Sequence, residues 1–465
     1  MTDLLICDGD IVTMNAQRQV VTAATIAVSG STIAAIGRAA ELRAAYPDAG
    51  ELDARDCVVI PGMINAHQHT TADPLMRSMI PDDIGSDESI FGWVLPLHAV
   101  LDGDDDELAA TLTAVESLSR GVTTVLEAGT VGHPLRVAAG LRKAGIRARV
   151  GRWGWDVADQ PFAAPTAQTL AAQEEAITAL ASDGPVTGWI SLVGHDLASD
   201  ELFAGAAELA ARLDVGLTLH MSPSEADSKS YAARSGLRPL EHLRRLGVLG
   251  PRLVLGHAVW LDDGELDAVL DSGTAIASCP AAYLRLGQGY ARAGRHGEFR
   301  RRGGRLALGA DSHNAGDSPD VLHAAYLLAA LENDRGSENA IRADQAFGLA
   351  TIDGANAVGM GALVGSIEVG KAADLAVLEA SSLGWMPRGD LALQLIWGRA
   401  SGSVRDVVVN GSLVLRDRRS TTVDVDALRS ELVERSGAAL RRAGIEVGHR
   451  WPAVPVAGFS KLAGR

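Results

Sequence analysis

PGMINAHQHT, residues 61–70, places two histidines one residue apart, directly after a Pro-Gly and a short apolar run. In a β-strand, residues i and i+2 share a face, so His67 and His69 can point in the same direction. Two histidines alone cannot hold a catalytic metal ion, and an isolated His-x-His is weak support for a metal site. The interpretation of this stretch therefore depends on whether further ligands follow at positions that the same fold would bring together.

The composition narrows the classes of partner. The chain has 465 residues, enough for one large barrel and a smaller domain. Its net charge of −16 argues against nucleic acid or an anionic membrane as a partner and suits a neutral or cationic small molecule. The three cysteines lie far apart, so no disulfide framework or thiolate zinc site is expected. No secretory signal and no apolar run of about 18 residues is visible, so we expect a cytoplasmic protein.

The two ends of the chain have the texture of short β-strands. Apolar and polar residues alternate over residues 1–58, with Gly and Asp at the turns, and the same texture returns over residues 361–420. We expect these two segments to form one small β-sandwich domain. Residues 421–465 begin with a helical pattern, VDALRSELVERSGAALRRAG, and end in a Pro-containing tail.

The middle of the chain, residues 59–360, alternates short aliphatic runs with amphipathic segments. Two of these segments, residues 104–121 and 199–214, open with acidic residues that suit a helix N-terminus. Strands that alternate with helices over this length predict a (β/α)₈ TIM barrel rather than an open sheet. The eight strand candidates are MINAHQH, TTVLEAG, RARVGRW, WISLVGH, GLTLHM, RLVLGHA, TAIASC and RLALGAD.

Five polar side chains end predicted strands of this barrel. His67 and His69 end the first strand, His220 the fifth, His257 the sixth and Asp311 the eighth. Barrel active sites are built from that rim. Imidazoles and one carboxylate suit Zn²⁺ or a similar ion with one position left for water, whose pKa the ion lowers to about 7. Each residue alone has a structural explanation, but the five together, each on a predicted strand end, indicate a metal site.

These motifs in combination resemble the amidohydrolase superfamily. The pattern PG-x4-HxH is followed by His220, His257 and the GAD that ends in Asp311. GSIEVGKAADLAVLE, residues 365–379, resembles that family's return from the barrel to the small sheet, and ATIDGANAVGM, residues 350–360, its last barrel helix. The resemblance covers residues 2–416. Within the superfamily it is greatest to the branch of cytosine and guanine deaminases, triazine hydrolases, and phenylurea or molinate hydrolases.

The resemblance implies roles for the five residues. His67, His69, His220 and Asp311 would hold one divalent ion, with Zn²⁺ favoured and Co²⁺, Mn²⁺ or Fe²⁺ as alternatives. His257 would stand beside the ion, and Asp311 would also carry a proton from water to the leaving group. The fourth strand, WISLVGHDLASD, ends without the lysine or glutamate that bridges two ions in related enzymes, so we expect a mononuclear centre. Homo-oligomers are common in such proteins, and we expect one here.

The chain departs from the deaminase pattern after the fifth strand. Deaminases of this branch carry a glutamate three residues after the fifth-strand histidine, and that acid protonates a ring nitrogen. Here Pro223 stands at that position, and Glu225 is the nearest candidate to replace it as a catalytic acid unless it is a solvated loop residue. An amide, urea or carbamate carbonyl needs no ring protonation. The missing acid therefore favours hydrolysis of an acyclic C–N bond.

The leading hypothesis is accordingly a metal-dependent hydrolase that cuts a C–N bond of a small neutral amide, urea or carbamate. The alternative is a deaminase or triazine-type hydrolase that acts on a heteroaromatic ring, and a noncatalytic barrel is the third possibility. Under the leading hypothesis, apolar side chains would line the substrate pocket. The candidate pocket residues, each of which could instead have a structural role, are Trp93, Trp153, Trp155, His195, Tyr283 and His313.

Overall fold

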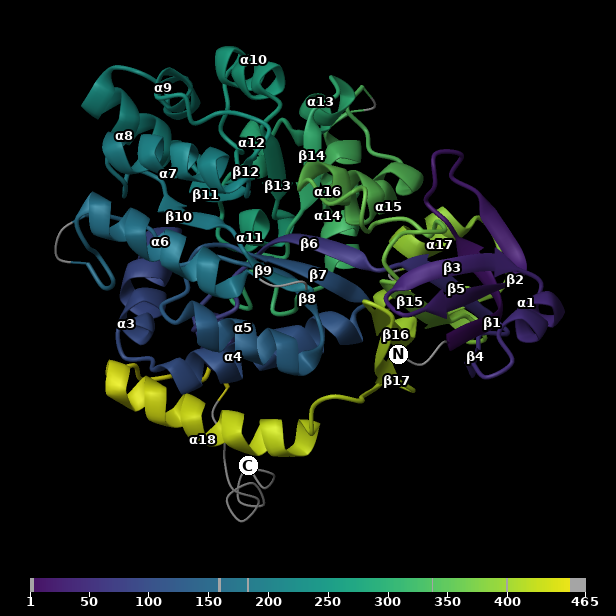
Figure 1. Cartoon of the computed structure of the whole chain (residues 1–465). Helices are drawn as coiled ribbons and strands as arrows, with labels where there is room; N and C mark the ends of the chain where they lie inside the picture. The colour runs from purple at the N-terminus through teal and green to yellow at the C-terminus, as the bar shows by residue number, and fades with distance from the viewer. Residues whose placement is uncertain (1–3, 158–159, 182–183, 337, 399, 452–465) are drawn as a thin grey trace, which may run out of the picture.

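The computed structural model describes residues 4–157, 160–181, 184–336, 338–398 and 400–451, and a closed barrel of parallel strands occupies its centre (Figure 1). One run of hydrogen-bonded strands has the order β6-β7-β8-β9 and the other β10-β11-β12-β13-β14. Only Trp189 separates β9 from β10, so these two short pieces together make the fourth stave. The strands are β6 (Met63–Gln68), β7 (Val122–Glu127), β8 (Arg147–Val150), β9 (Val186–Gly188), β10 (Ile190–Gly194), β11 (Leu217–Met221), β12 (Leu253–His257), β13 (Ala275–Ser278) and β14 (Arg305–Leu308).

The barrel closes between its first and last strands. A parallel bridge joins Gln68 to Asp311, just past β14. The Asp311 N–H donates to the His67 carbonyl at 2.9 Å, and the His69 N–H donates to the Asp311 carbonyl at 3.0 Å. The predicted (β/α)₈ barrel is confirmed, and its closure brings the first and last polar strand ends together.

Helices cover the outside of the barrel, and their ends follow the local sequence. The two helices expected from their acidic starts are α4 (Gly103–Ser119) and α7 (Asp200–Leu213), capped by the side chains of Asp102 and Ser199. The others are α5 (Pro134–Ala144), α6 (Thr166–Leu180), α8 (Glu225–Ser235), α9 (Pro239–Arg245), α10 (Asp263–Ser272), α11 (Pro280–Arg285), α12 (Tyr290–Ala293), α13 (His296–Arg301), α14 (Val321–Arg335), α15 (Ala343–Ala350) and α16 (Ile352–Ala357).

A long connection between β6 and α4 folds over the rim of the barrel. It contains short helical turns that follow one another without a strand between them. They are η1 (Asp73–Met76), α2 (Ser86–Ser89), the π-helical η2 (Ile90–Val94) and α3 (Leu95–His98). This segment forms one side of the pocket described below.

The two ends of the chain form a second sheet beside the barrel (Figure 1). Its order is β18-β17-β16-β15-β5-β1-β2-β3, with β4 also paired to β1. The C-terminal strands join the N-terminal strands where β15 pairs with β5, so both ends of the chain build one sheet as expected. Arg147 of the barrel donates to Asp374 at 2.7 and 2.9 Å, a buried ion pair that joins the two parts. The strands are β1 (Leu4–Val12), β2 (Val20–Ser29), β3 (Thr32–Gly37), β4 (Gly50–Asp53), β5 (Cys57–Pro61), β15 (Leu375–Glu379), β16 (Val404–Val409), β17 (Ser412–Arg416) and β18 (Arg419–Ser420).

The remaining elements lie at the edges of these two parts. Domain boundaries near residues 58, 360 and 420 stay a prediction, supported by where the sheet strands end and the barrel strands begin. None of the helices in the described residues has both the length and the apolar character that a bilayer span needs. The edge elements are α1 (Ala39–Ala45), η3 (Leu383–Trp385), α17 (Leu391–Trp397) and η4 (Ala400–Ser403).

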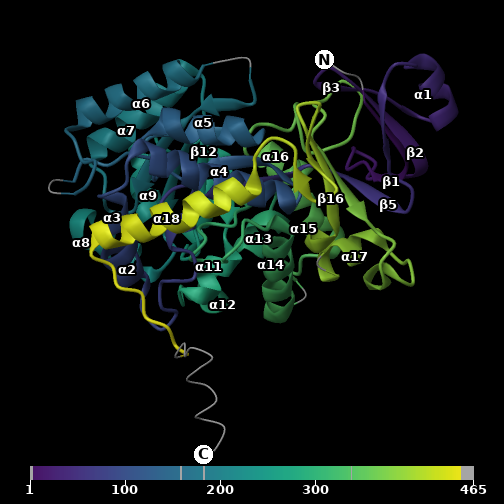
Figure 2. The same cartoon turned by 90° about the horizontal axis from the view of Figure 1, so that it is seen from below.

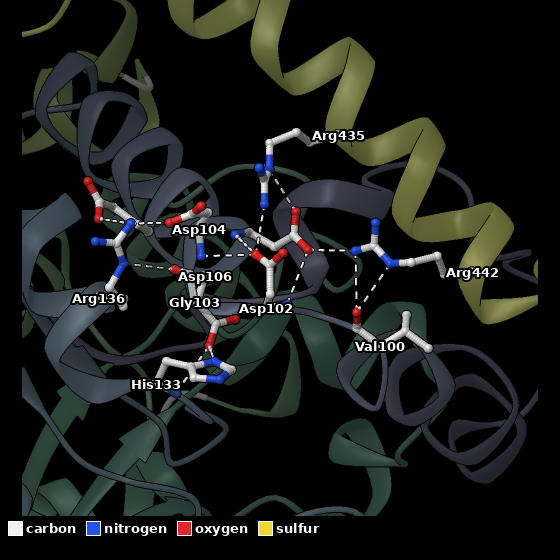
Figure 3. A network of polar contacts seen from close by, with 11 residues as sticks. Val100, Asp102, Gly103, Asp104, Asp106, His133, Arg136, Arg435 and Arg442 are labelled. Carbon is white, nitrogen blue, oxygen red and sulfur yellow. Dashed lines mark hydrogen bonds and ion pairs between the residues drawn. The ribbon is translucent and has the colours of Figure 1, made fainter.

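The last helix, α18 (Val425–Ala443), runs across α3 and α4 like a strap (Figure 2). Arg435 donates to Asp102 at 2.7 Å and to Asp105 at 2.8 Å, and Arg442 donates to Asp105 at 2.6 Å (Figure 3). Asp105 is buried, so these two guanidinium groups neutralise a charge that water does not reach. The Ser436 hydroxyl also donates to the Leu75 carbonyl in η1. The strap thereby holds the segment that carries one wall of the pocket.

Replacing Arg435 with alanine should lower the free energy of unfolding by about 1–3 kcal/mol, because a buried carboxylate loses a charged donor. Urea denaturation followed by circular dichroism would measure the change. Arg429→Ala is the matched control on the same helix. Arg429 pairs at 2.9 Å with Asp426, whose side chain is 91% exposed, so its loss should cost about 0.5 kcal/mol or less. Equal effects of the two substitutions would contradict the structural role of the strap.

Candidate metal centre

The five polar strand ends converge at one end of the barrel. Ligand atoms of His67, His220 and His257 lie within 4.8 Å of one another, and so do those of His67, His69 and Asp311. The Nε2 atoms of His69 and His220 are 3.2 Å apart, and His69 Nε2 is 3.4 Å from Asp311 Oδ1. His257 Nδ1 lies 3.9 Å from Asp311 Oδ2. The structure therefore brings together all five residues that the sequence indicates.

The hydrogen bonds of the metal-centre histidines leave ring nitrogens with free lone pairs, and these nitrogens converge on one point. His220 Nδ1 lies 2.8 Å from the Val193 carbonyl, which can only accept, so Nδ1 carries the proton and Nε2 presents a lone pair. His69 Nδ1 lies 2.8 Å from the Thr130 hydroxyl, which leaves its Nε2 for the same point. Both ring nitrogens of His67 are buried with no hydrogen-bond partner. Buried nitrogens without partners are costly, and a cation between them would satisfy them.

The electrostatics fit the same donor set. Burial and the neighbouring imidazoles lower the pKa of His67 and His220 well below its usual value, so both rings are neutral, as metal ligands must be. Burial also lowers the pKa of His257 to about 4. Burial alone would raise the pKa of Asp311, but the nearby His69 outweighs it and lowers that pKa to about 2. Burial alone would lower the pKa of His69, but the Asp311 carboxylate outweighs it and raises that pKa to about 9, so His69 would release a proton when it binds an ion. Three neutral imidazoles, His69 and one ionised carboxylate make a site for a divalent metal ion.

Two glycines make room for His67. A β-carbon on Gly256 would lie 2.5 Å from Cε1 of the His67 ring, and one on Gly309 would lie 2.7 Å from its Cβ. The backbone is also unusual at two of the polar residues, since His257 and Asp311 have φ angles of 75° and 65°. Non-glycine residues rarely adopt this left-handed conformation, and it concentrates at functional sites. It turns each side chain at the point where its strand ends.

The second strand supplies a support that the sequence analysis missed. Glu127, the last residue of β7, is fully buried, and its carboxylate accepts from the N–H groups of Gly129 at 2.7 Å and Thr130 at 3.3 Å. Burial raises the pKa of Glu127 to about 7. These bonds place the Thr130 hydroxyl against His69. A lone glutamate at the end of a predicted strand, in TTVLEAG, was the only sign of this role in the sequence.

A cavity of about 320 Å³ is lined by four of the five residues, His69, His220, His257 and Asp311. His195 lines it, and its Nδ1 lies 2.9 Å from Asp227, whose carboxylate also accepts from the Ser222 N–H at 2.6 Å. The His195 ring stacks beside His220, with centroids 5.6 Å apart. Apolar side chains form much of the remaining wall, among them Ile90, Phe91, Val94, Leu95, Trp153, Trp155, Leu197 and Leu286.

Comparisons with known proteins agree with this geometry. The family model described as "Amidohydrolase family" matches residues 58–414. The chain belongs to the amidohydrolase family. A second model, an imidazolonepropionase-like composite domain of bacteria, matches residues 26–49 within the small sheet. As an amidohydrolase, the chain is a metal-dependent hydrolase that acts on carbon–nitrogen bonds other than peptide bonds.

Individual relatives of this amidohydrolase extend over nearly its whole length. It is 31% identical over 434 residues to a 5-methylthioadenosine/S-adenosylhomocysteine deaminase of Syntrophobacter fumaroxidans, which covers 93% of this chain and 96% of the relative. A zinc-bound adenosine deaminase structure from Xanthomonas campestris superposes with a TM-score of 0.89 at 27% identity, covering 95% and 99% of the two chains. A zinc complex of atrazine chlorohydrolase from Arthrobacter aurescens shares the fold, with a TM-score of 0.86 at 24% identity over 93% and 100%.

Four predicted residues of this amidohydrolase lie outside the cavity. The Glu225 carboxylate pairs with Lys229 at 2.8 Å and its side chain is 53% exposed, so Glu225 is not placed to act as a catalytic acid. Trp93 of η2 is partly buried and packs against the hydrophobic core, whereas Ile90, Phe91 and Val94 of the same helix line the cavity. His313 binds Glu116 at 2.9 Å. Tyr283 is buried, and its hydroxyl accepts from the Cys279 N–H at 2.7 Å.

Alanine substitutions at the metal centre should separate ligands from their neighbours. Asp311→Ala should abolish turnover and lower metal content, because the centre loses its one anionic ligand. His257→Ala should lower turnover by about 10²–10⁴-fold while metal content falls much less, since His257 is expected beside the ion. Elemental analysis and steady-state kinetics on folded variants would show this. Equal loss of metal and turnover in His257→Ala would make His257 a ligand.

Replacing Thr130 with valine should weaken metal affinity by about 10–100-fold, because His69 loses the group that orients its ring. Competition with a chromophoric chelator measures the affinity directly. Thr124→Val is the matched control on β7, since the Thr124 hydroxyl is buried but has no hydrogen-bond partner. An unchanged affinity in Thr130→Val, or an equal loss in both variants, would contradict the orienting role.

Proposed function

We propose that this amidohydrolase removes an exocyclic amino group from a heteroaromatic ring, with an adenine-type base as the most favoured substrate. Water supplies the oxygen that replaces nitrogen on the ring carbon, the C–N bond breaks, and the amine leaves as ammonia. The names of the relatives support this choice, since the relatives at 31% and 27% identity described above are deaminases of adenine nucleosides. The sequence analysis favoured an acyclic amide or urea, because it found no acid in place of the missing glutamate.

The observation that carries the proposal is the His195–Asp227 pair. Pro223 lines the cavity at the position of the missing glutamate, and His195, at the end of the neighbouring strand β10, lines it too. Burial disfavours a charged His195, yet the Asp227 carboxylate outweighs this effect and raises the pKa of His195. A protonated imidazole whose Nδ1–H binds Asp227 can donate from Nε2 to a ring nitrogen. His195 can therefore take the place of the missing glutamate as the acid that protonates a ring nitrogen.

The other residues divide the remaining work. A bound divalent ion would make hydroxide available at neutral pH. Asp311 accepts the proton of the attacking water and transfers it to the departing nitrogen. His257, next to Asp311, hydrogen-bonds the attacking water. Trp153 and Trp155 offer apolar faces against which a flat ring can pack. One zinc ion per subunit is the most favoured content, supported by the donor set and by zinc in the adenosine deaminase structure.

One observation favours a second function. Glu225 faces solvent, which is the placement expected for an enzyme that cuts an acyclic amide, urea or carbamate. The apolar cavity would accept such a compound as well. Assembly as a homo-oligomer and a place in the cytoplasm stay predictions under either function.

A substrate panel on the zinc-loaded enzyme tests the proposal. Adenine nucleosides, aminotriazines, phenylureas and carbamates would be compared by coupled detection of ammonia and by detection of released amines. We expect ammonia from an adenine compound with kcat/KM of about 10⁴ M⁻¹ s⁻¹ or more. Amine release from ureas or carbamates without any ring deamination would establish the second function instead.

Asp227→Asn should lower kcat for the ring substrate by about 10²–10⁴-fold with metal content unchanged, because His195 loses the carboxylate that keeps it protonated. Glu225→Gln is the matched control two residues away, and it should retain activity, since its carboxylate faces Lys229 in solvent. The reverse result, an active Asp227→Asn and an inactive Glu225→Gln, would assign the acid role to Glu225.

A further inference from the structure

Apart from histidines, every ionisable side chain in the described wall of the cavity is an acid. Five carboxylates line it, those of Asp73, Asp87, Asp196, Asp227 and Asp311, whereas no lysine or arginine is among the described residues of its wall. Three of these acids already interact with other groups of the protein. Asp311 belongs to the metal centre, Asp227 holds His195, and Asp196 pairs with Arg234 at 2.9 Å. Asp73 and Asp87 remain, with no ion-pair partner in the part of the chain that the structure describes.

Asp73 and Asn314, both buried residues of the cavity wall, form a hydrogen-bond acceptor site. Asp73 is 3% exposed, and its carboxylate accepts from the Asn314 side-chain amide at 2.9 Å. That bond fixes the amide so that its NH₂ faces Asp73, and the Asn314 side-chain oxygen is buried with no partner. A buried acceptor without a partner is costly, and a substrate N–H or O–H would satisfy it. The wall is therefore suited to a ligand that brings donors.

Asp87 stands at the outer side of the same cavity. It lies in α2, is exposed, and follows Ser86, which also lines the wall. A negative group that entered past Asp87 would approach several carboxylates, and no lysine or arginine of the described wall would pair with it. Like charges at such an interface act against the wrong ligand more than they help the right one.

We propose that this pocket selects heteroaromatic amines whose side arm is neutral or cationic and rich in hydrogen-bond donors, and that it rejects arms that carry a carboxylate or a phosphate. The inference rests on the proposed function, because it assumes that the ring amine lies at the metal centre. The proposed selectivity differs from that expressed in the name of the relative from Syntrophobacter fumaroxidans, because S-adenosylhomocysteine carries a carboxylate.

Three adenine nucleoside thioethers test the selection on the zinc-loaded full-length protein. Their 5′ arms end in a methyl group, in a primary ammonium group, or in an amino-acid group with both ammonium and carboxylate. We expect kcat/KM for the methyl and ammonium compounds to exceed that for the amino-acid compound by about 10–100-fold. The difference should shrink with added salt, because Asp87 is exposed and its field is screened.

Asp87→Lys should lower the preference for the ammonium arm over the amino-acid arm by about 10-fold or more. Glu88→Lys is the matched control, since Glu88 is the next residue of α2, is exposed, and does not line the cavity. It changes the net charge by the same amount and should leave the preference as it is. An equal change in both variants would overturn the role of Asp87.

Calorimetric binding of the same three compounds keeps the two proposals apart. If no compound releases ammonia but the methyl and ammonium compounds still bind more tightly than the amino-acid compound, the proposed deamination fails and the charge selection stands. Equal or tighter binding or turnover of the amino-acid compound overturns the charge selection alone. Failure of all three to bind overturns both.

Discussion

The contact on which the rest of this molecule depends is the closure of the barrel between β6 and β14. The Asp311 N–H donates to the His67 carbonyl, and the His69 N–H donates to the Asp311 carbonyl. The residues that close the cylinder are thus three of the metal-centre residues. Their backbones bind one another while their side chains turn to a common point. Metal-centre geometry and barrel closure are therefore one constraint, and a shift in strand register would disrupt both.

Barrel closure crowds the metal-centre side chains, and the neighbouring residues leave room for them. Gly256 and Gly309 leave space for His67, and the left-handed backbone of His257 and Asp311 turns their side chains where the strands end. Buried ring nitrogens of His67 and His257 have no hydrogen-bond partner among the described residues, which is unfavourable until a cation binds between the rings. Metal binding would therefore offset the cost of these buried nitrogens, which the fold brings together before an ion binds.

In the proposed function, the acid of the pocket lies at the end of the fourth strand instead of after the fifth. Where the resemblance leads one to expect a glutamate after the fifth strand, this chain has Pro223, and its loop instead directs Asp227 inward to His195. The same loop sends Glu225 outward to Lys229. A helix that begins at Glu225 explains the difference, since residues i and i+2 of a helix point to different sides. The His195–Asp227 contact at 2.9 Å holds the imidazole that we propose as the proton donor.

What the sequence by itself determined is the barrel, the small sheet built from both ends, and the five polar strand ends. Strand and helix periods are local, and ligand types at strand ends follow from the rim of the barrel, so one sequence suffices for both. Only the tertiary structure decided which acid faces the cavity, that Glu127 and Thr130 orient His69, and that Trp93, Tyr283 and His313 lie outside it. These outcomes depend on the direction of side chains in loops and on contacts between segments far apart in the chain, and no local pattern encodes them.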